Sequence, residues 1–113
     1  MKLVKDIKSI DFDYVICTIP FPVLRRIELI GLSESKNRAI RNLSYTSMFW
    51  DESEWAGGAF CIQKPGDVIN YYEDTISPEG NLFFAGEHCS LDRSWIQGAI
   101  ISAIRAIKDV VSK

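Results

Sequence analysis

The sequence is poor in the residues that build metal and disulfide sites. One histidine, His88, occurs in 113 residues, which excludes a site made of several histidines. The three cysteines, Cys17, Cys61 and Cys89, are odd in number and widely spaced, so they predict neither a disulfide framework nor a C-x-x-C site. Cys17 and Cys61 lie in apolar stretches and are expected to be buried and unreactive. Cys89 lies in a polar loop and is expected to be the accessible thiol.

Long apolar runs and an excess of one charge are also missing. No run approaches the roughly 20 residues of a membrane-spanning helix, and the first residues, MKLVKDIKSIDF, lack the continuous apolar core of a signal peptide. The net charge is −2, with lysine and arginine spread along the chain, so neither a nucleic-acid nor a membrane partner is expected. The content of 47% hydrophobic and 25% charged residues is typical of a soluble globular protein. We therefore expect one cytoplasmic domain spanning residues 1–113.

The apolar patterns of the first half indicate an α/β fold. Tyr14–Ile19 is rich in β-branched residues and apolar on both faces, which predicts a central strand in a covered sheet. A proline follows, and a short helix is expected over Val23–Leu29. A second helix, capped by Ser33 or Ser35, is expected to run to about Leu43. Its apolar stripe is Ala39, Ile40 and Leu43, and its basic residues, Lys36, Arg38 and Arg41, are expected to face water.

The middle of the chain is harder to interpret. Met48–Trp55 is aromatic and acidic at once, and the pair Gly57-Gly58 then breaks the chain before a short strand predicted over Ala59–Ile62. Turns are predicted at Lys64–Asp67 and Ser77–Asn81. The pattern between these turns, over residues 68–75, fits neither a helix nor a strand clearly.

The stretch Asn81–Ile100 is the one around which the chain is organised. It predicts a buried strand over Leu82–Ala85, a tight exit at Gly86, a polar loop, and a helix that begins at or near Ser94. Ser94 and Gln97 have the spacing of a capping box. The helix has one apolar face, expected to pack on the core, made of Ile96, Ala99, Ile100, Ala103, Ile107 and Val110.

Two interpretations of this stretch stand side by side. In the first, Gly86 lets the backbone pass close to a ligand, Glu87 accepts hydrogen bonds from its hydroxyls, and the helix start from Ser94 to Gln97 offers free N–H groups. In the second, it is a plain strand-to-helix loop with a glycine turn and a surface glutamate. Trp95 has the same ambiguity, because it can pack on the core or form an aromatic wall beside a ligand.

Three segments carry a resemblance to a known family. FFAGEHCSLDRSWIQGAIISAIRA resembles the C-terminal motif of the flavin-containing amine oxidases, which include monoamine, L-amino-acid and polyamine oxidases. In that family an aromatic-Ala-Gly-Glu run is followed by a short loop, an aromatic residue, Glu/Gln-Gly-Ala and a helix. DYVICTIP with Val23-Leu24 resembles the family's strand and helix before the substrate domain, and Trp50–Phe60 resembles a Trp-containing segment that ends in Gly-Gly. Most of the chain is covered by these matches.

The resemblance implies a role for each matching residue. Glu87, next to Gly86, would hydrogen-bond the ribityl or phosphate region of FAD. Phe60 and Trp95 would flank a substrate amine in front of the flavin. Ala59 stands where the monoamine oxidases have the cysteine that bonds the flavin, so FAD would be bound non-covalently. No catalytic or metal-binding residue is implied. The helix start would meet the flavin and favour negative charge on its reduced ring; its residues are Ser94, Trp95, Ile96, Gln97, Gly98 and Ala99.

The sequence also departs from the family pattern. It has no G-x-G-x-x-G turn to grip the FAD pyrophosphate. Ser47 runs directly into Met48 where the family carries a substrate domain with a lysine near the flavin, and Ser94 replaces a common glycine. The chain is therefore expected to be part of an α/β, Rossmann-like FAD-binding domain that lacks the dinucleotide motif and the substrate domain.

These departures bear directly on function. The parent reaction would be oxidative deamination of a small amine or L-amino acid, but the chain alone is expected to bind FAD weakly or not at all and to be inactive. Two alternatives remain. One is a non-catalytic α/β module that self-associates or pairs with another chain, such as an N-terminal half. The other is an unrelated α/β fold with a chance motif, in which Glu87 and Ser94 would not share one cleft.

Overall fold

A computed structural model describes residues 11–42 and 64–113. The expectations for Phe60, Ala59, Trp50, the Gly57-Gly58 pair and Cys61 lie outside the described residues. Among the described residues, no helix is long and apolar enough to cross a membrane. The elements in chain order are β1 (Val15–Cys17), α1 (Phe21–Leu24), α2 (Glu34–Asn42), α3 (Asp67–Ile76), β2 (Leu82–Phe84), a short 3₁₀ turn η1 (Glu87–Cys89) and α4 (Ile96–Val111).

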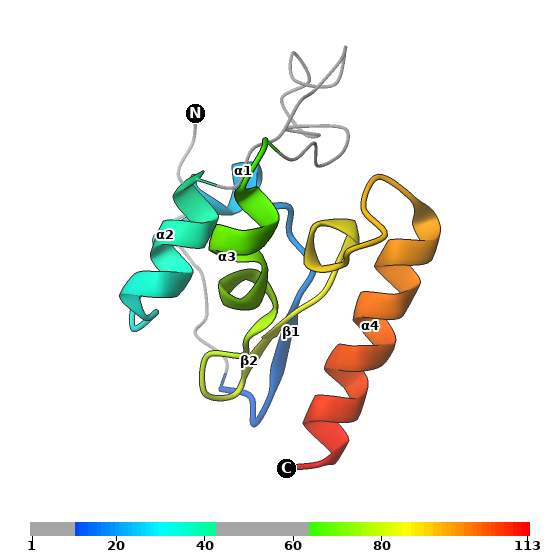
Figure 1. The fold of residues 1–113 in the computed structure, drawn as a ribbon. Coiled ribbons are helices and arrows are strands. Elements are labelled where there is room, and N and C mark those ends of the chain that lie inside the picture. The colour runs from blue at the N-terminus through cyan, green and yellow to red at the C-terminus, as the bar shows by residue number, and fades with distance from the viewer. Residues whose placement is uncertain (1–10, 43–63) are drawn as a thin grey trace, which may run out of the picture.

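The described strands form one small sheet between two helical layers. β1 and β2 are parallel, and Val15, Ile16 and Cys17 pair with Leu82, Phe83 and Phe84. Helix α4 lies along one side of the sheet, and α2 and α3 lie on the other (Figure 1). This mixed α/β arrangement confirms the expected fold class at the level of α/β.

Alternation along β2 decides which side chains enter which layer. Successive strand residues point to opposite faces, so Phe84 joins the cluster beneath α1, α2 and η1, while Phe83 and Ala85 pack against Ala106 of α4. Phe21, at the start of α1, is fully buried and meets the Phe84 ring edge-on, 6.2 Å between centroids. The strand at the centre of the predicted site is therefore the best-buried element of the sheet.

The first strand is present but is not covered as expected. The exposed fractions are 43% for Val15 and 40% for Ile16, where a central strand would be buried on both faces. The sheet has only one other strand among the described residues, so β1 lies at its edge. An apolar hollow of about 340 Å³ also runs along β1, lined mainly by Val15, Cys17, Leu24, Leu29, Leu82 and Phe84.

The helices around the sheet begin and end for local reasons. Ser33 caps α2, because its Oγ accepts the Lys36 N–H at 3.2 Å. Helix α1 ends at Leu24, earlier than the predicted Leu29. The ambiguous stretch after Gly66 is a helix, α3, and both flanking turns are formed, with Gly66 and Gly80 in left-handed conformations.

Lys36 does not face water, so that prediction is wrong. Its side chain is fully buried, and Nζ donates to the carbonyl oxygens of Thr75 (3.1 Å) and Ser77 (2.6 Å) at the end of α3. The same ammonium lies 4.1 Å from the centroid of the Phe84 ring. Periodicity failed here because carbonyls at a helix C-terminus attract a cation, and a lysine stem is itself apolar. Burial lowers the pKa of Lys36 to about 8.

The apolar face predicted for the last helix packs only in part, because Ala103 and Val110 contact the cluster around Phe83 while its isoleucines do not. The buried residues of α4 are Gly98, Ser102 and Ala106, spaced four apart. The isoleucines instead remain exposed, among them Ile96 (81%) and Ile107 (54%). A Cβ added at Gly98 would lie 1.8 Å from the Asp92 carbonyl oxygen, so small side chains let this side approach the sheet and loop closely. Size, rather than hydrophobicity, selects the packed face.

Candidate functional site

The candidate site lies where β2 ends and α4 begins. Gly86 follows the strand with φ of +140°, a conformation that side chains with a Cβ rarely adopt. A Cβ there would lie 2.5 Å from the ring of His88. The glycine is therefore required by the chain's own backbone and by His88, which is a different reason from the ligand approach proposed from the sequence.

Glu87 and Ser94 close the loop between strand and helix. The Oε2 atom of Glu87 accepts the backbone N–H of Ser94 at 2.9 Å. The two residues therefore lie side by side, which the chance-motif alternative did not expect. The N–H of Ser94 is not free for a ligand, contrary to the sequence interpretation, because the carboxylate already receives it.

Ser94 adopts a conformation that suits the glycine it replaces. Its φ is +65°, and among the described residues it is the one non-glycine residue with positive φ. A residue with a Cβ is strained in this left-handed region. The helix then begins one residue later than the capping box predicted, since Trp95 occupies the N-cap position without a side-chain cap.

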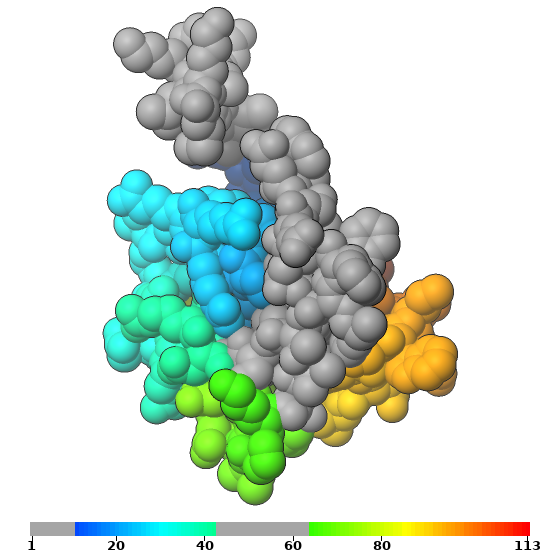
Figure 2. Space-filling model, turned by 90° about the horizontal axis from the view of Figure 1, so that it is seen from above, coloured from blue at the N-terminus to red at the C-terminus, as the bar shows by residue number. Residues whose placement is uncertain are grey.

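The start of α4 is open to solvent. Trp95 is 75% exposed and Gln97 is also exposed, whereas Gly98 is buried against the preceding loop. The first N–H groups of a helix have no partner within it and carry a partial positive charge. Seen from above, the segment entering α4 lies at the rim of the molecule, on the side away from α2 (Figure 2). Trp95 therefore does not pack into the core.

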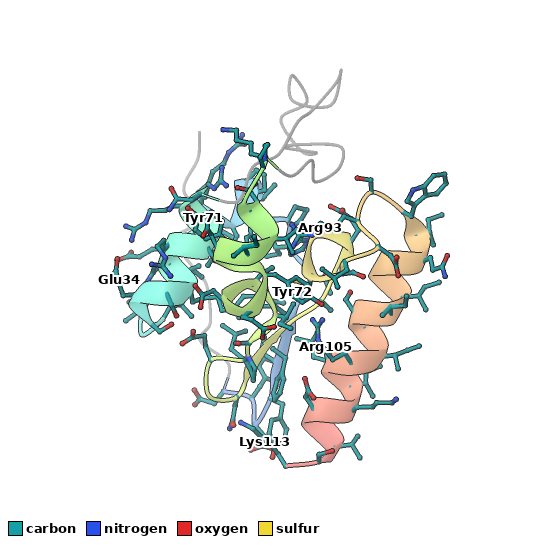
Figure 3. The ribbon with its side chains drawn as sticks, in the orientation of Figure 1. Glu34, Tyr71, Tyr72, Arg93, Arg105 and Lys113 are labelled. Carbon is teal, nitrogen blue, oxygen red and sulfur yellow. The ribbon has the colours of Figure 1, made fainter. Side chains whose placement is uncertain are left out.

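Two side chains of α4 that sequence analysis passed over hold the loop in place. Ser102 is fully buried; its Oγ accepts the Gly86 N–H at 2.8 Å and lies within donating distance of the carbonyl oxygens of Gly86 (2.7 Å) and Ala99 (2.8 Å). Arg105 reaches from α4 towards the sheet (Figure 3) and donates to the carbonyl oxygens of Cys89 (2.8 Å) and Phe84 (3.3 Å). The repeat of Gly98, Ser102 and Ala106 at intervals of four is the signal that would have marked this face.

The two residues between Glu87 and Ser90 are structural. The His88 ring is buried and stacks at a tilt on Phe21, 4.8 Å between centroids. Burial, helped by the nearby charge of Arg93, lowers the pKa of His88 to about 4, so the ring is neutral at physiological pH. Cys89 is fully buried, and burial raises the pKa of its thiol to about 12. The expectation that Cys89 is the accessible thiol is therefore wrong; Cys17 is more exposed than Cys89.

Arg93 contacts both its own loop and helix α3. Its side chain is buried, its Nε donates to the Ser90 carbonyl at 2.8 Å, and its guanidinium lies 5.8 Å from the centroid of the Tyr72 ring. The labelled view shows Arg93 and Tyr72 between the loop and α3 (Figure 3). These contacts hold Arg93 between the loop and α3, close to the carboxylate of Glu87 and the start of α4.

The groups at this corner match part of what a polyhydroxyl or dinucleotide cofactor needs. A carboxylate, an exposed indole and a helix start lie together at the carboxyl end of a parallel strand, where α/β proteins bind ligands. Among the described residues no group of His, Cys, Asp and Glu is arranged to hold a metal ion.

Comparison with known proteins matches the chain to one protein family. The family model for flavin containing amine oxidoreductases matches residues 3–49 and 47–111. The two matched segments overlap at residues 47–49, next to the Ser47–Met48 junction where the sequence predicted a missing substrate domain. The candidate site therefore falls within the second matched segment.

Individual relatives agree with this family. The candidate L-amino-acid oxidase YobN of Bacillus subtilis (strain 168) is 41% identical over 84 residues, which are 73% of this chain and 18% of YobN. The flavin-dependent L-tryptophan oxidase RebO of Lentzea aerocolonigenes is 40% identical over 67 residues, 57% of this chain and 14% of RebO. An L-amino-acid oxidase of Demansia vestigiata is 33% identical over 73 residues, 63% of this chain and 14% of the relative. The chain thus spans less than a fifth of the length of each of these relatives.

Proposed function

The chain belongs to the flavin-containing amine oxidoreductase family, and we propose that it forms the C-terminal part of a Rossmann-like FAD-binding domain of the L-amino-acid oxidase type. The observation that carries the proposal is the bonded pair at the end of β2, Glu87 with the Ser94 N–H, beside the open start of α4. A carboxylate there accepts hydrogen bonds from cofactor hydroxyls, and the helix start favours negative charge.

We propose a division of roles within the site. Glu87 binds the ribityl or phosphate region of FAD, and the backbone from Ser94 to Ala99, through Ile96, Gln97 and Gly98, lies against the flavin. Trp95 and Phe60 flank the substrate. When bound, FAD accepts a hydride from the carbon of a C–N bond and returns its electrons to oxygen as peroxide, leaving an imine that water hydrolyses. Ser102 and Arg105 position the loop that carries Glu87.

The type of substrate follows from the relatives. Those named above are described as L-amino-acid or L-tryptophan oxidases, which supports an L-amino acid over other amines. Ala59 stands where a covalent flavin bond would need cysteine, so the proposed FAD is non-covalent. We place the protein in the cytoplasm, as the composition suggested.

We further propose that the chain alone does not turn over substrate, since it carries one wall of the site. The test is to purify the chain and measure flavin absorbance and amino-acid-dependent peroxide. The expected result is a colourless protein without peroxide production. Stoichiometric yellow flavin with turnover would contradict the proposal.

The alternative is a non-catalytic module that self-associates or pairs with another chain. The exposed apolar residues of α4 favour it. Sedimentation and flavin uptake separate the two functions: a strict monomer counts against the module, and flavin uptake on mixing with an N-terminal half supports the FAD-binding domain.

A further inference from the structure

The loop that leads to Ser94 is folded around Ser90, which follows the 3₁₀ turn η1. Ser90 is buried, and its Oγ accepts the Asp92 N–H at 3.1 Å. Its carbonyl oxygen accepts the Nε of Arg93 at 2.8 Å. Side-chain bonds over two or three positions of this kind fold the chain into a local turn. The next residue is Ser94, whose N–H is bonded to the Glu87 carboxylate.

The Arg93 side chain reaches from this turn to another element of the fold. It is only 8% exposed, and the centre of its guanidinium lies 5.8 Å from the centroid of the Tyr72 ring on α3. A guanidinium within about 6 Å of an aromatic face is attracted by the electrons of the ring. Tyr72 is half-buried, so water screens this attraction only in part. Arg93 therefore joins α3 to the loop, as the labelled view shows (Figure 3).

The residue next to Arg93 has a backbone conformation that needs support. Ser94 has φ of +65°, in the left-handed region. A residue with a Cβ stays in this region only where the contacts around it over-determine its conformation. Two such contacts lie on either side of Ser94, because Glu87 receives its N–H and the Arg93 side chain fixes the residue before it. A looser Arg93 would therefore weaken the hold on Ser94.

We infer that Arg93 is a positioning residue for the bonded pair of Glu87 and Ser94, and that Tyr72 couples helix α3 to this pair through Arg93. The inference deepens the proposed function and rests on it for the role of this corner as a cofactor site. Under that function, α3 helps to orient the carboxylate and the helix start that meet the cofactor, although Tyr72 itself lies outside the corner. A change of the Tyr72 ring then alters the corner from a distance.

The experiment removes the Tyr72 ring and follows the Ser94 amide. NMR of the full chain without flavin measures the rate at which the amide proton of Ser94 exchanges with water. In Tyr72→Leu this rate is expected to rise about fivefold, the factor that corresponds to the loss of a partly buried cation–π contact. Tyr72→Phe is the matched control, because it keeps the ring and removes only the hydroxyl. Its exchange rate at Ser94 is expected to equal that of the parent.

Several results would overturn the inference. One is an unchanged Ser94 rate in Tyr72→Leu, and another is an equal rise in Tyr72→Phe, which assigns the effect to the hydroxyl. A similar rise at the amides of α2 shows that the whole fold has loosened, and it also overturns the inference. Arg93→Lys tests the same contact if Tyr72→Leu does not fold. A lysine ammonium cannot donate to the Ser90 carbonyl and lie flat on the ring at once, so the Ser94 rate is expected to rise, and a rate equal to the parent's contradicts the positioning role.

The outcome of this measurement is separate from that of the proposed function, because no flavin takes part in it. Flavin uptake on mixing with an N-terminal half tests the proposed function. If the Ser94 rate rises in Tyr72→Leu but flavin is never taken up, the positioning role is supported and the proposed FAD site is contradicted. If flavin is taken up but the Ser94 rate does not depend on the ring, the FAD site is supported and the coupling through Tyr72 is contradicted.

Discussion

At the scale of single residues, the site depends on backbone conformations that few side chains tolerate. Gly86 has φ of +140° with His88 packed where a Cβ would stand. Ser94 has φ of +65°, and its N–H is held by the Glu87 carboxylate. The family resemblance places a common glycine at this second position, and the structure supplies the physical reason for that preference.

Substitution of Ser94 by glycine is expected to stabilise the protein by about 1 kcal/mol. Glycine removes the left-handed strain, which outweighs its greater freedom in the unfolded chain. Ser112→Gly is the control, since Ser112 has φ of −85° in the right-handed region and gains nothing from glycine. Urea unfolding of both variants measures the difference. Destabilisation by Ser94→Gly would show that its serine side chain contributes more than the strain costs.

His88 gives the protein a predictable acid sensitivity. Its pKa falls from 6.5 to about 4 on folding, so the folded state binds fewer protons between these values. The stability that this difference contributes is present above pH 6.5 and is lost as the pH falls towards 4, by at most about 3 kcal/mol. His88→Gln cannot titrate, and its free energy of unfolding is expected to fall less over this window. If the free energy of unfolding falls by the same amount in the parent and in His88→Gln, His88 is not the source of the acid sensitivity.

At the scale of elements, α4 packs with its small residues against the sheet and loop, and its large apolar residues do not determine which side is buried. The side facing the sheet consists of Gly98, Ser102 and Ala106, and it lets the Asp92 carbonyl and the Gly86 backbone come within reach of the helix. Arg105 adds bonds to the loop and strand. Helix and loop are therefore one unit, and the start of α4 is oriented by contacts further along the same helix.

Gly98→Ala tests this close approach. The added Cβ would lie 1.8 Å from the Asp92 carbonyl oxygen, so backbone must move. We expect a loss of about 2 kcal/mol or more, although alanine favours a helix by about 1 kcal/mol over glycine. Gln97→Ala, at the exposed neighbouring position, is expected to change stability by less than about 0.5 kcal/mol. Thermal unfolding distinguishes them, and a Gly98→Ala variant as stable as the parent would refute the tight contact.

At the scale of the whole molecule, the described residues make a sheet of two parallel strands with helices on both sides. One strand is well covered and the other is half exposed. The exposed isoleucines of α4 lie on one side of the sheet, and the apolar hollow along β1, lined by Leu24 and Phe84, lies on the other. Exposed apolar surface of this extent is typical of an interface. Under the proposed function, the cofactor site at the end of this sheet has one wall in this chain.

This incompleteness predicts how the melting temperature responds to the cofactor. A ligand stabilises in proportion to the logarithm of its concentration over its dissociation constant. Added FAD is therefore expected to leave the melting temperature of the chain alone unchanged. Differential scanning fluorimetry with and without FAD measures the melting temperature. A rise for the chain alone would show that one wall suffices for binding.

The sequence by itself determined the family, the strand Leu82–Phe84, the turns around it and the existence of α2 and α4, because these follow from local motifs, caps and apolar periodicity. It also brought Glu87 and Ser94 to one place, since both lie in a single short loop. Only the tertiary structure decided burial. Lys36 is inside because helix-end carbonyls and an aromatic ring receive its ammonium, Cys89 is inside because the loop folds over it, and the isoleucines of α4 are outside because small residues allow closer packing. Burial of each side chain depends on which residues pack against it in the folded protein, and the spacing of residues along the sequence does not contain this information.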